Sequence, residues 1–345
     1  MSTQNSSTHD GQGPSSTIRR ALVSGATGFI GRYLVERLSA DGINVHALSR
    51  SAKTLPESPL VQVLNGDVRD PRTADGASVN IDTVFHLAGR AHALAEIEQD
   101  FDSYLSVNVG GTRNLIEAAA EAGVRRFVFF SSVKAMGEGS DVRVDESAEP
   151  SPTTPYGRTK LMAEEVVFRI GEESGMHVCC LRLPMVIGAG NKGNIFRMIA
   201  AIDKKMFPPL PEVHNHRSLV HVQDVVEAAI LVATNPLANR KVYIVTDDQV
   251  YSTRQLYDSI CHRLGKKIPP WSMPLAMLRI LARIGDVFGR ARGRRFLFDS
   301  DAFEKLLGSA WYSSAKITSE MGYHPSTTFE TALPGIIRWY RQDQK

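Results

Sequence analysis

The sequence predicts an α/β protein built on a doubly wound parallel sheet, with a smaller lobe towards its C-terminus. Two observations support this fold class. Short runs rich in β-branched residues alternate with helix-like stretches from Arg19 onward, and three glycines fall within seven residues where the first apolar run ends. Strands separated by helices of this length form βαβ units, which require a parallel sheet covered by helices on both faces.

The expected elements follow in order along the chain. We predict strands at 20–25, 44–50, 61–67, 81–89, 125–132, 177–188 and 241–247. We predict helices at 31–42, 108–123, 156–175, 224–233, 252–265 and 274–289, where the pattern is typical of helices. Residues 133–155 are rich in Gly, Pro and Ser and are expected to form a loop.

The composition changes near Asn191, where proline-rich segments replace the regular alternation. We therefore expect a sheet domain at 18–190 and a second lobe over most of 191–345, with part of 215–250 returning to the sheet domain. Residues 1–17 are polar, nearly uncharged and without the apolar stretch of a signal peptide, so we expect a disordered tail there.

The overall charge argues against two classes of main partner. Forty basic against 37 acidic residues leave a formal charge of +3, which is too small to indicate nucleic acid or an anionic membrane as the main partner. No window approaches the ~18 uninterrupted apolar residues of a membrane span, so no integral membrane segment is expected. The three cysteines form no CxxC pair and indicate a reducing compartment, so we expect a cytoplasmic protein.

Gly25, Gly28 and Gly31 lie between the first strand and the first helix, which is the context of a dinucleotide-binding turn. Gly25 permits the tight turn, Gly28 lets the backbone approach a pyrophosphate at the positive helix end, and Gly31 lets the helix pack closely on the sheet. Phe29 and Ile30, between the second and third glycines, belong to the same predicted site. An ordinary strand-to-helix turn is the alternative.

Further cofactor contacts are expected at the carboxyl ends of later strands, where ligands of doubly wound sheets bind. Asp67 stands where its carboxylate would accept a hydrogen bond from an adenine amine, and Val68 follows it. Leu87, Ala88 and Gly89 end the fourth strand at the same edge. Together with the glycine turn, these residues predict a Rossmann-like site for a dinucleotide.

Several motifs, in this order, resemble those of the extended short-chain dehydrogenase/reductase family, in particular its NAD(P)-dependent nucleotide-sugar epimerases, dehydratases and 4-ketoreductases. The motifs read GATGFIG, GDV, HLAG, NVGGT, SSVKAMG and YGRTK, and the resemblance spans about Arg19 to Tyr340. The resemblance implies a nucleoside diphosphate sugar as substrate, a homodimer, and a role for Asn108 in supporting the active-site helix.

The choice of dinucleotide depends on the end of the second strand. An NAD-preferring relative usually has an acid there, on the adenosine ribose diol, whereas this chain has Ser49 followed by Arg50. Nothing at that point repels a 2′-phosphate, and a guanidinium is a suitable phosphate clamp. The sequence therefore favours NADP(H) over NAD(H), with a solvated Arg50 as the alternative.

Tyr156 and Lys160 stand four residues apart at the start of a predicted helix, so their side chains share one face. Hydride transfer to or from a carbonyl carbon requires a group that exchanges a proton with the oxygen at near-neutral pH. A nearby ammonium favours the phenolate of Tyr156 by charge attraction. By the resemblance, Lys160 also binds the nicotinamide ribose. Also by the resemblance, Ser132, five residues before Gly137, holds the substrate oxygen, with Ser131 as the alternative.

The two residues after this serine narrow the reaction. Nucleotide-sugar 4,6-dehydratases generally carry Asp-Glu there, as acid and base for the elimination of water, whereas this chain carries Val133 and Lys134. A dehydratase is therefore not expected. Lys134 either meets a phosphate or a sugar hydroxyl of the substrate or is a solvated loop lysine.

The second lobe holds the expected substrate contacts. By the resemblance, Asn194 gives its amide to the diphosphate region, and Arg217 clamps a phosphate with bidentate geometry. Asp224 is expected to cap a helix. His92, after the fourth strand, either reaches the sugar or is exposed. No metal site is predicted, because no carboxylate or thiol stands at a spacing that completes a zinc set with the histidines His214, His216 and His221.

Residues 274–295 combine apolar residues at helical spacing with six arginines. A basic amphipathic helix of this kind can lie on an anionic membrane surface. The interpretation that the sequence favours is an amphipathic helix packed on the second lobe and followed by a solvated basic loop.

Three functions remain open. The favoured one is a 4-ketoreductase that moves hydride from NADPH to C4 of a UDP-(N-acetyl)hexosamine-type sugar in bacterial surface-polysaccharide biosynthesis. The second is a 4-epimerase that retains NAD, oxidises C4 and returns the hydride to the opposite face. The third is a non-catalytic dinucleotide-sensing protein, which the presence of Ser132, Tyr156 and Lys160 argues against.

Overall fold

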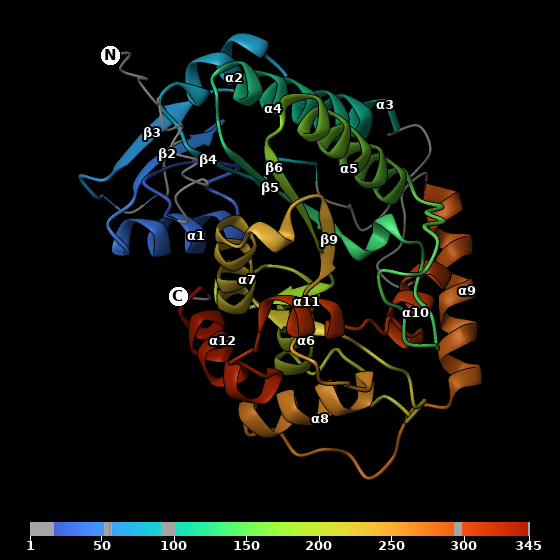
Figure 1. Cartoon of the computed structure of the whole chain (residues 1–345). Helices are drawn as coiled ribbons and strands as arrows, with labels where there is room; N and C mark the ends of the chain where they lie inside the picture. The colour runs from blue at the N-terminus through green and yellow to red at the C-terminus, as the bar shows by residue number, and fades with distance from the viewer. Residues whose placement is uncertain (1–16, 52–54, 56, 91–100, 293–298, 344–345) are drawn as a thin grey trace, which may run out of the picture.

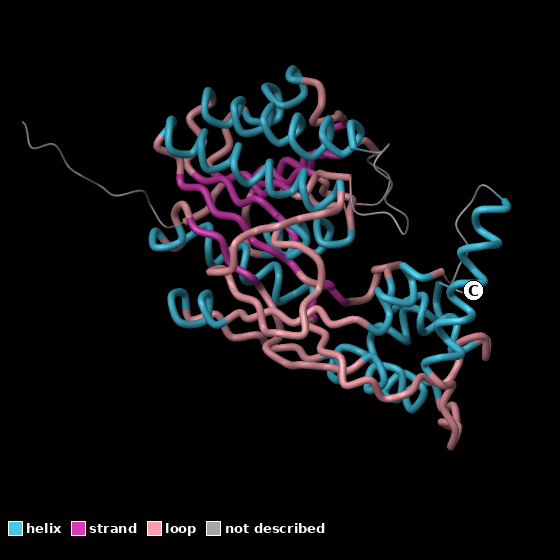
Figure 2. The backbone as a smooth tube through the Cα atoms, turned by 90° about the vertical axis from the view of Figure 1, so that its right-hand side faces the viewer, coloured by secondary structure: helices cyan, strands magenta, loops and turns pink. Residues whose placement is uncertain are grey.

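A computed structural model describes residues 17–51, 55, 57–90, 101–292 and 299–343, so that His92 and all of the expected tail but Thr17 lie outside the described residues. Seven parallel strands form one sheet in the order β3-β2-β1-β4-β5-β6-β9, with helices on both faces (Figures 1 and 2). The predicted doubly wound fold is confirmed. The strands of the sheet are β1 (Arg20–Ser24), β2 (Asn44–Ser49), β3 (Val61–Asn65), β4 (Thr83–His86), β5 (Arg126–Ser132), β6 (His177–Leu183) and β9 (Lys241–Ile244).

The strand expected at 177–188 is in fact two strands. β6 ends at Leu183, and β7 (Met185–Ile187) pairs instead with β8 (Leu219–His221) in a separate two-stranded sheet. Pro184 stands between β6 and β7, and a proline has no N–H to donate to a sheet ladder. The break directs the chain away from the main sheet and into the second lobe.

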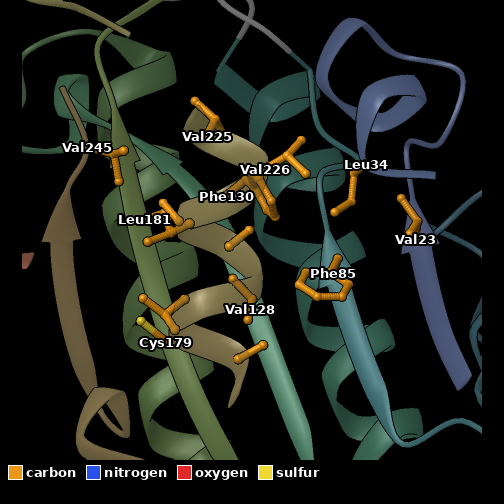
Figure 3. Packing of buried hydrophobic residues seen from close by; sticks show 14 of the residues in the cluster. Val23, Leu34, Phe85, Val128, Phe130, Cys179, Leu181, Val225, Val226 and Val245 are labelled. Atoms are coloured by element: carbon orange, nitrogen blue, oxygen red, sulfur yellow. The ribbon is translucent and has the colours of Figure 1, made fainter. Parts of the chain in front are cut away.

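Helices cover the sheet through two hydrophobic clusters, one on each face. In the first cluster, Leu34 of α1 (Phe29–Ala40) and Val226 of α7 (Val222–Thr234) pack with Phe130 of β5 (Figure 3). Cys179 and Cys180 face opposite clusters, and burial raises the pKa of both thiols, as expected for structural cysteines. The covering helices are α1 (Phe29–Ala40) and α7 (Val222–Thr234) on one face and α2 (Pro71–Ser78), α4 (Gly111–Glu121) and α5 (Pro155–Ser174) on the other.

A second lobe, rich in helices, lies beyond the carboxyl ends of the strands and has its own cluster of buried side chains (Figures 1 and 2). The chain enters this lobe after β6 and returns to the sheet through α7 and β9. Its helices are α6 (Asn194–Asp203), α8 (Thr253–Leu264), α9 (Leu275–Arg292), α10 (Ser300–Leu307) and α12 (Phe329–Asp343), while α11 (Ala315–Met321) packs beside β9.

Asp224 does not have the predicted capping role. Helix α7 begins at Val222, and its N-cap is His221, whose ring nitrogen accepts a backbone N–H of the first turn at 3.4 Å. Asp224 is buried within that first turn, where its carboxylate accepts the backbone N–H groups of Ser326 and Thr327 at 2.9 and 3.2 Å. The carboxylate therefore joins α7 to the segment before α12, a partner that local sequence does not reveal.

Candidate active site

The loops that follow β1 and β4 meet where the strand order of the sheet reverses, which is where ligands of such sheets bind. Gly25, directly after β1, has a φ of +70°, and an added Cβ there would lie 2.8 Å from the backbone nitrogen of Ala88. Ser24 accepts a hydrogen bond from that same nitrogen at 3.2 Å, and its carbonyl accepts the N–H of Leu87 at 3.1 Å. The turn at Gly25 is therefore held directly against the loop after β4.

The start of α1 suits a phosphate group. An added Cβ at Gly31 would overlap the carbonyl oxygen of Gly25, so only glycine lets the helix lie this close to the turn. Gly28 is the N-cap and places no side chain over the first-turn amides, which begin with those of Phe29 and Ile30. Such amides lack intrahelical partners and stand at the positive end of the helix dipole, where an anion is favoured.

A line of hydrogen bonds joins the ends of β1 and β4 to α4. Ser24 bonds Nδ1 of His86 at 2.6 Å, and Nε2 of His86 bonds the hydroxyl of Thr112 at 2.9 Å. Burial, together with the charge of Lys160, lowers the pKa of His86 to about 3, so the ring stays neutral. Sequence reasoning missed this histidine, although a polar residue within an apolar strand was a usable signal.

Asn108 connects the loop after β4 with helix α5. It lies in a π-helical turn, η2 (Leu105–Gly110), between α3 (Phe101–Tyr104) and α4. Its side chain accepts the backbone N–H of Arg90 at 2.8 Å and donates to the hydroxyl of Thr159 at 3.1 Å. A buried amide that is paired at both ends fixes the position of α5 relative to the sheet edge.

The two serines at the end of β5 have different partners. Ser131 donates its hydroxyl to Glu164, and Glu164 in turn forms a buried ion pair with Arg182, with contacts of 3.0 and 2.7 Å. The hydroxyl oxygen of Ser132 accepts the backbone N–H of Lys134 at 3.2 Å. This bond uses a lone pair of the oxygen and does not use the hydroxyl hydrogen. Ser131 therefore belongs to a structural cluster, whereas the hydroxyl hydrogen of Ser132 can be donated to a substrate oxygen.

Lys160 is buried on α5 beside the end of β5. Its Nζ donates to the carbonyl oxygen of Phe130 at 2.6 Å and lies 4.2 Å from the ring centre of Phe129. Burial lowers the pKa of Lys160 to about 8, and the Glu164 carboxylate opposes this shift. The side chain is therefore charged at neutral pH and is held in one place.

Tyr156 is the second residue of α5 and is half-buried. The start of this helix lies directly on η3 (Val133–Ala135), the turn that follows Ser132. The two segments are so close that an added Cβ at Gly157 would overlap the carbonyl oxygen of Lys134. This contact brings the tyrosine to the end of β5, one helical turn from the buried ammonium described above.

The adenosine end of the predicted site lies after β2 and β3. The hydroxyl of Ser49 bonds that of Thr27 in the glycine turn at 2.6 Å, whereas Arg50 is exposed. Both carboxylate oxygens of Asp67 accept from the guanidinium of Arg69, at 2.7 to 3.1 Å, and these bonds lower the pKa of Asp67. A carboxylate has further lone pairs, so its contact with an adenine amine stays a prediction.

The two predicted diphosphate contacts both lie in the second lobe. Asn194 is the first residue of α6 and lines a small pocket that also includes Gly188. The guanidinium of Arg217 donates to the carbonyl oxygens of Lys305 and Gly308 at the end of α10, and burial lowers its pKa. Within the described part of the chain, no carboxylate pairs with this guanidinium.

The remaining polar candidates do not converge on one point. Lys134 forms an ion pair with Glu138. His216 stacks on Trp311 with ring centres 4.4 Å apart, and the buried ring nitrogens Nδ1 and Nε1 of this pair have no hydrogen-bond partner among the described residues. His221 caps α7 instead. No group of three or more potential metal ligands occurs among the residues that the structure describes.

The sequence pattern of the NAD dependent epimerase/dehydratase family matches residues 21–245. The chain belongs to this family. The matched region runs from the second residue of β1 to the residue after β9 and therefore contains all of the seven-stranded sheet but Arg20. The expected resemblance is confirmed.

Named members of the family are similar to nearly the whole chain. UDP-glucose 4-epimerase of Vibrio cholerae is 29% identical over 93% of this chain and 95% of that protein. The N-acetyl-alpha-D-glucosaminyl-diphospho-ditrans,octacis-undecaprenol 4-epimerase of Escherichia coli O157:H7 is 28% identical over 92% of this chain and 94% of that protein. The structure of MoeE5 in complex with UDP-glucose and NAD is similar with a TM-score of 0.75 at 27% identity, and the similarity covers 94% of this chain and 100% of that one.

Membership of the NAD dependent epimerase/dehydratase family confirms the expected nicotinamide dinucleotide as cofactor. The residues of this chain fit such a group, because bare backbone lines its expected path: an added Cβ at Gly25 or Gly31 would overlap neighbouring backbone atoms, and one at Gly89 would lie 3.0 Å from the side chain of Asn108. Val68, expected beside the adenine, is buried. The glycine turn would hold the diphosphate and Lys160 the nicotinamide ribose.

Proposed function

We propose that this protein is a 4-epimerase of a glycosyl diphosphate of the UDP-(N-acetyl)hexosamine type. The observation that supports it most is the arrangement at the end of β5. There Ser132 has a hydroxyl hydrogen to donate, Tyr156 lies on the helix that touches the next turn, and Lys160 is a buried ammonium. The choice of epimerisation is supported by two named 4-epimerases that are similar over more than nine tenths of the chain.

A bound nicotinamide would supply the acceptor, and then the donor, of the hydride at C4. Tyr156 takes the proton of the C4 hydroxyl as the hydride leaves, which yields a ketone, and gives the proton back when the hydride returns to the opposite face. Ser132 donates a hydrogen bond to the same oxygen as its charge develops. The charge of Lys160 favours the phenolate of Tyr156. The two half-reactions balance, so no reductant is consumed.

Arg217 and Asn194 would bind the diphosphate. The guanidinium of Arg217 is buried, yet its partners are two neutral carbonyl oxygens, and an anionic oxygen makes a stronger hydrogen bond. Lys134 would move from Glu138 to a phosphate or a sugar hydroxyl, at small cost because this ion pair is partly exposed.

The test is direct incubation of the purified protein with UDP-N-acetylglucosamine and, separately, with UDP-glucose. We expect the C4 epimer of at least one to form without a net change in nicotinamide absorbance. Tyr156→Phe should lower kcat by about 100-fold or more while dinucleotide binding is kept. Failure of the wild-type protein, saturated with NAD, to isomerise either sugar would count against the proposal.

A 4-ketoreductase is the second candidate, because Ser49 and the exposed Arg50 at the end of β2 bring no acid to the ribose diol. The cofactor content of the freshly purified protein separates the two. Tightly held NAD at one equivalent supports the epimerase, whereas empty sites, oxidation of NADPH by a UDP-4-keto sugar, and weaker NADPH binding in Arg50→Ala support the reductase.

We further propose a homodimer formed through the outer faces of α4 and α5. Met162 on α5 is 36% exposed, and Leu161 and Phe168 of the same helix are partly exposed. Light scattering of the wild-type protein should give twice the monomer mass, and Met162→Glu should shift the mass towards the monomer.

A further inference from the structure

Helix α9 turns most of its apolar side chains towards the solvent. Where its side chains are described, Leu278, Ala282 and Gly285 are buried, and these form the narrow stripe through which the helix packs on the lobe. Helix α9 therefore packs on the second lobe, as expected, but only through these buried residues, and most of its apolar face is exposed. The exposed apolar side chains of α9 are Leu275, Met277, Ile280, Leu281, Ile284, Val287 and Phe288, each between 40% and 65% exposed.

These exposed side chains form a continuous surface, because from Met277 to Phe288 they recur at three- and four-residue spacing. We call the side chains of Met277, Ile280, Leu281, Ile284, Val287 and Phe288 the α9 stripe. Arg279 and Arg283, four residues apart and both exposed, lie on one side of this stripe, and the guanidinium of Arg279 also lies 5.7 Å from the ring centre of Phe303. Helix α9 stands at the outer edge of the molecule (Figure 1). It therefore presents an apolar face and a basic flank to the surroundings.

The segment 263–295, which contains α9, is strongly basic, whereas α10, which packs against α9, carries Asp301 and Glu304. Residues 263–295 contain nine of the forty basic residues and one of the 37 acidic residues, Asp286. The rest of the chain is therefore net negative, since the whole carries +3. Two further apolar side chains in the segment before the helix, Trp271 and Ile268, are 58% and 40% exposed, and tryptophan is enriched at the boundary between lipid and water.

We propose that α9 docks this protein on an anionic lipid bilayer, with the α9 stripe in the acyl boundary and the flanking arginines at the lipid phosphates. A second copy of the chain would fit less well, because lipid phosphates can pair with both arginines, whereas two α9 stripes packed antiparallel would bring Arg279 and Arg283 of both copies to the same seam. No helix in the described part of the chain is long and apolar enough to cross a bilayer, so the protein would lie on the surface.

A docked enzyme would meet substrates that a membrane lipid carries. If the proposed 4-epimerase function holds, on which this step rests, the substrate is a sugar linked through diphosphate to a polyprenyl lipid. The lipid chain would stay in the bilayer while the diphosphate lies at the second lobe and the sugar reaches Tyr156. The similar protein of Escherichia coli O157:H7 is named for a sugar carried in this way.

Co-sedimentation with vesicles tests the docking. We use the full chain with vesicles of phosphatidylglycerol and phosphatidylcholine, and with phosphatidylcholine alone. We expect binding to the anionic vesicles, a blue shift of the Trp271 fluorescence, and weaker binding at high salt. A protein that stays in the supernatant with both kinds of vesicle would overturn the proposal.

A variant that places charges in the α9 stripe makes the test specific. The double variant Ile284→Glu/Val287→Glu should lower the vesicle partition constant about 100-fold, at about tenfold per side chain withdrawn from lipid. Its thermal unfolding should be unchanged, because both side chains are already exposed, at 45% and 65%. The matched control Val79→Glu/Val142→Glu changes two exposed valines elsewhere and should bind like the wild type.

Two further measurements separate the alternatives. If the stripe instead pairs two copies, Ile284→Glu/Val287→Glu will lower the mass in light scattering without altering vesicle binding, which would overturn the docking. For the substrate, the double variant should epimerise UDP-N-acetylglucosamine as fast as the wild type but lose about tenfold or more on polyprenyl diphosphate N-acetylglucosamine in vesicles. If the wild type binds vesicles but acts on neither sugar, the proposed function fails and the docking stands.

Discussion

The ammonium of Lys160 and the carbonyl oxygen of Phe130 lie 2.6 Å apart. This bond joins the second turn of α5 to the strand that ends in Ser132, so it fixes the helix that carries Tyr156 against the strand that carries the serine. The same burial that gives the bond its low-dielectric surroundings also lowers the pKa of the lysine to about 8. The burial that holds Lys160 in place therefore also determines the pH at which it loses its charge.

The activity should fall as Lys160 loses its proton. Below about pH 8 the free enzyme carries the ammonium, which favours the phenolate of Tyr156, and above it that charge is lost. We expect kcat/KM, which reports the free enzyme, to decline above about pH 8. Lys160→Arg, which stays charged, should be less active but show no decline near that pH. A wild-type profile that stays level to about pH 10 would contradict this role of the lysine.

Lys160→Met should be more stable than the wild type at pH 7, although inactive. Folding opposes the charge of Lys160, since its pKa falls from 10.5 to about 8, which corresponds to about 3 kcal/mol. The lost bond to Phe130 offsets about 1 kcal/mol of this. Urea unfolding should therefore show a gain of about 1–2 kcal/mol at pH 7.

The gain from Lys160→Met should shrink as pH rises from about 8 to 10.5. In that range the unfolded wild-type chain binds more protons than the folded chain, so the stability of the wild type increases with pH. Lys192→Met, at an exposed lysine paired with Asp343, is the control and should show no such pH dependence. A loss of stability in Lys160→Met at pH 7 would refute this account.

Alanine substitutions at the two serines at the end of β5 should separate an effect on kcat from an effect on the free energy of unfolding. Ser132→Ala removes the donor to the substrate oxygen and should lower kcat by about 100-fold with little change in the free energy of unfolding. Ser131→Ala removes a partner of the buried Glu164 and should cost about 1–3 kcal/mol of stability while most of kcat is kept. Paired measurement of kcat and urea unfolding decides, and the reverse outcome would make Ser131 the catalytic serine.

Sequence reasoning located those parts of the site that depend on local spacing. Tyr156 and Lys160 share a helix face because they are four residues apart, and Gly25 and Gly31 are required by one strand-to-helix turn. These relations need no knowledge of the fold beyond a single element. The alternation of strands and helices also predicted the doubly wound parallel sheet, but it did not give the order of the strands.

Contacts between distant segments could not be found in this way. The bond of Asn108 to Thr159 was expected only as support for the active-site helix, and the partners of His86 and Glu164 lie on other strands and helices. The apolar periodicity at α9 correctly predicted an apolar helix face, but it did not show that this face is exposed. A repeat of apolar residues shows that such a face exists, and not which surface it contacts. Pro184 after β6 and the polar His86 within an apolar strand were the local signals that were overlooked.

Two glycine substitutions test the packing of the turn that the cofactor site requires. Gly31→Ala would push a Cβ into the carbonyl oxygen of Gly25, which is backbone and cannot rotate away. We expect a loss of about 1–3 kcal/mol in the free energy of unfolding, together with weaker dinucleotide binding, because α1 must shift from the phosphate position.

Gly76→Ala is the matched control for Gly31→Ala. Gly76 lies within α2, is exposed, and an added Cβ there meets nothing within 4 Å. The same chemical change should therefore stabilise the protein by about 0.5–1 kcal/mol, because alanine loses less backbone entropy than glycine in a helix. Urea unfolding and calorimetric titration with NAD and NADP measure both effects. Gly31→Ala could instead prove as stable as Gly76→Ala and bind either dinucleotide like the wild type. That result would show that Gly31 is not needed for close packing of α1 on the turn.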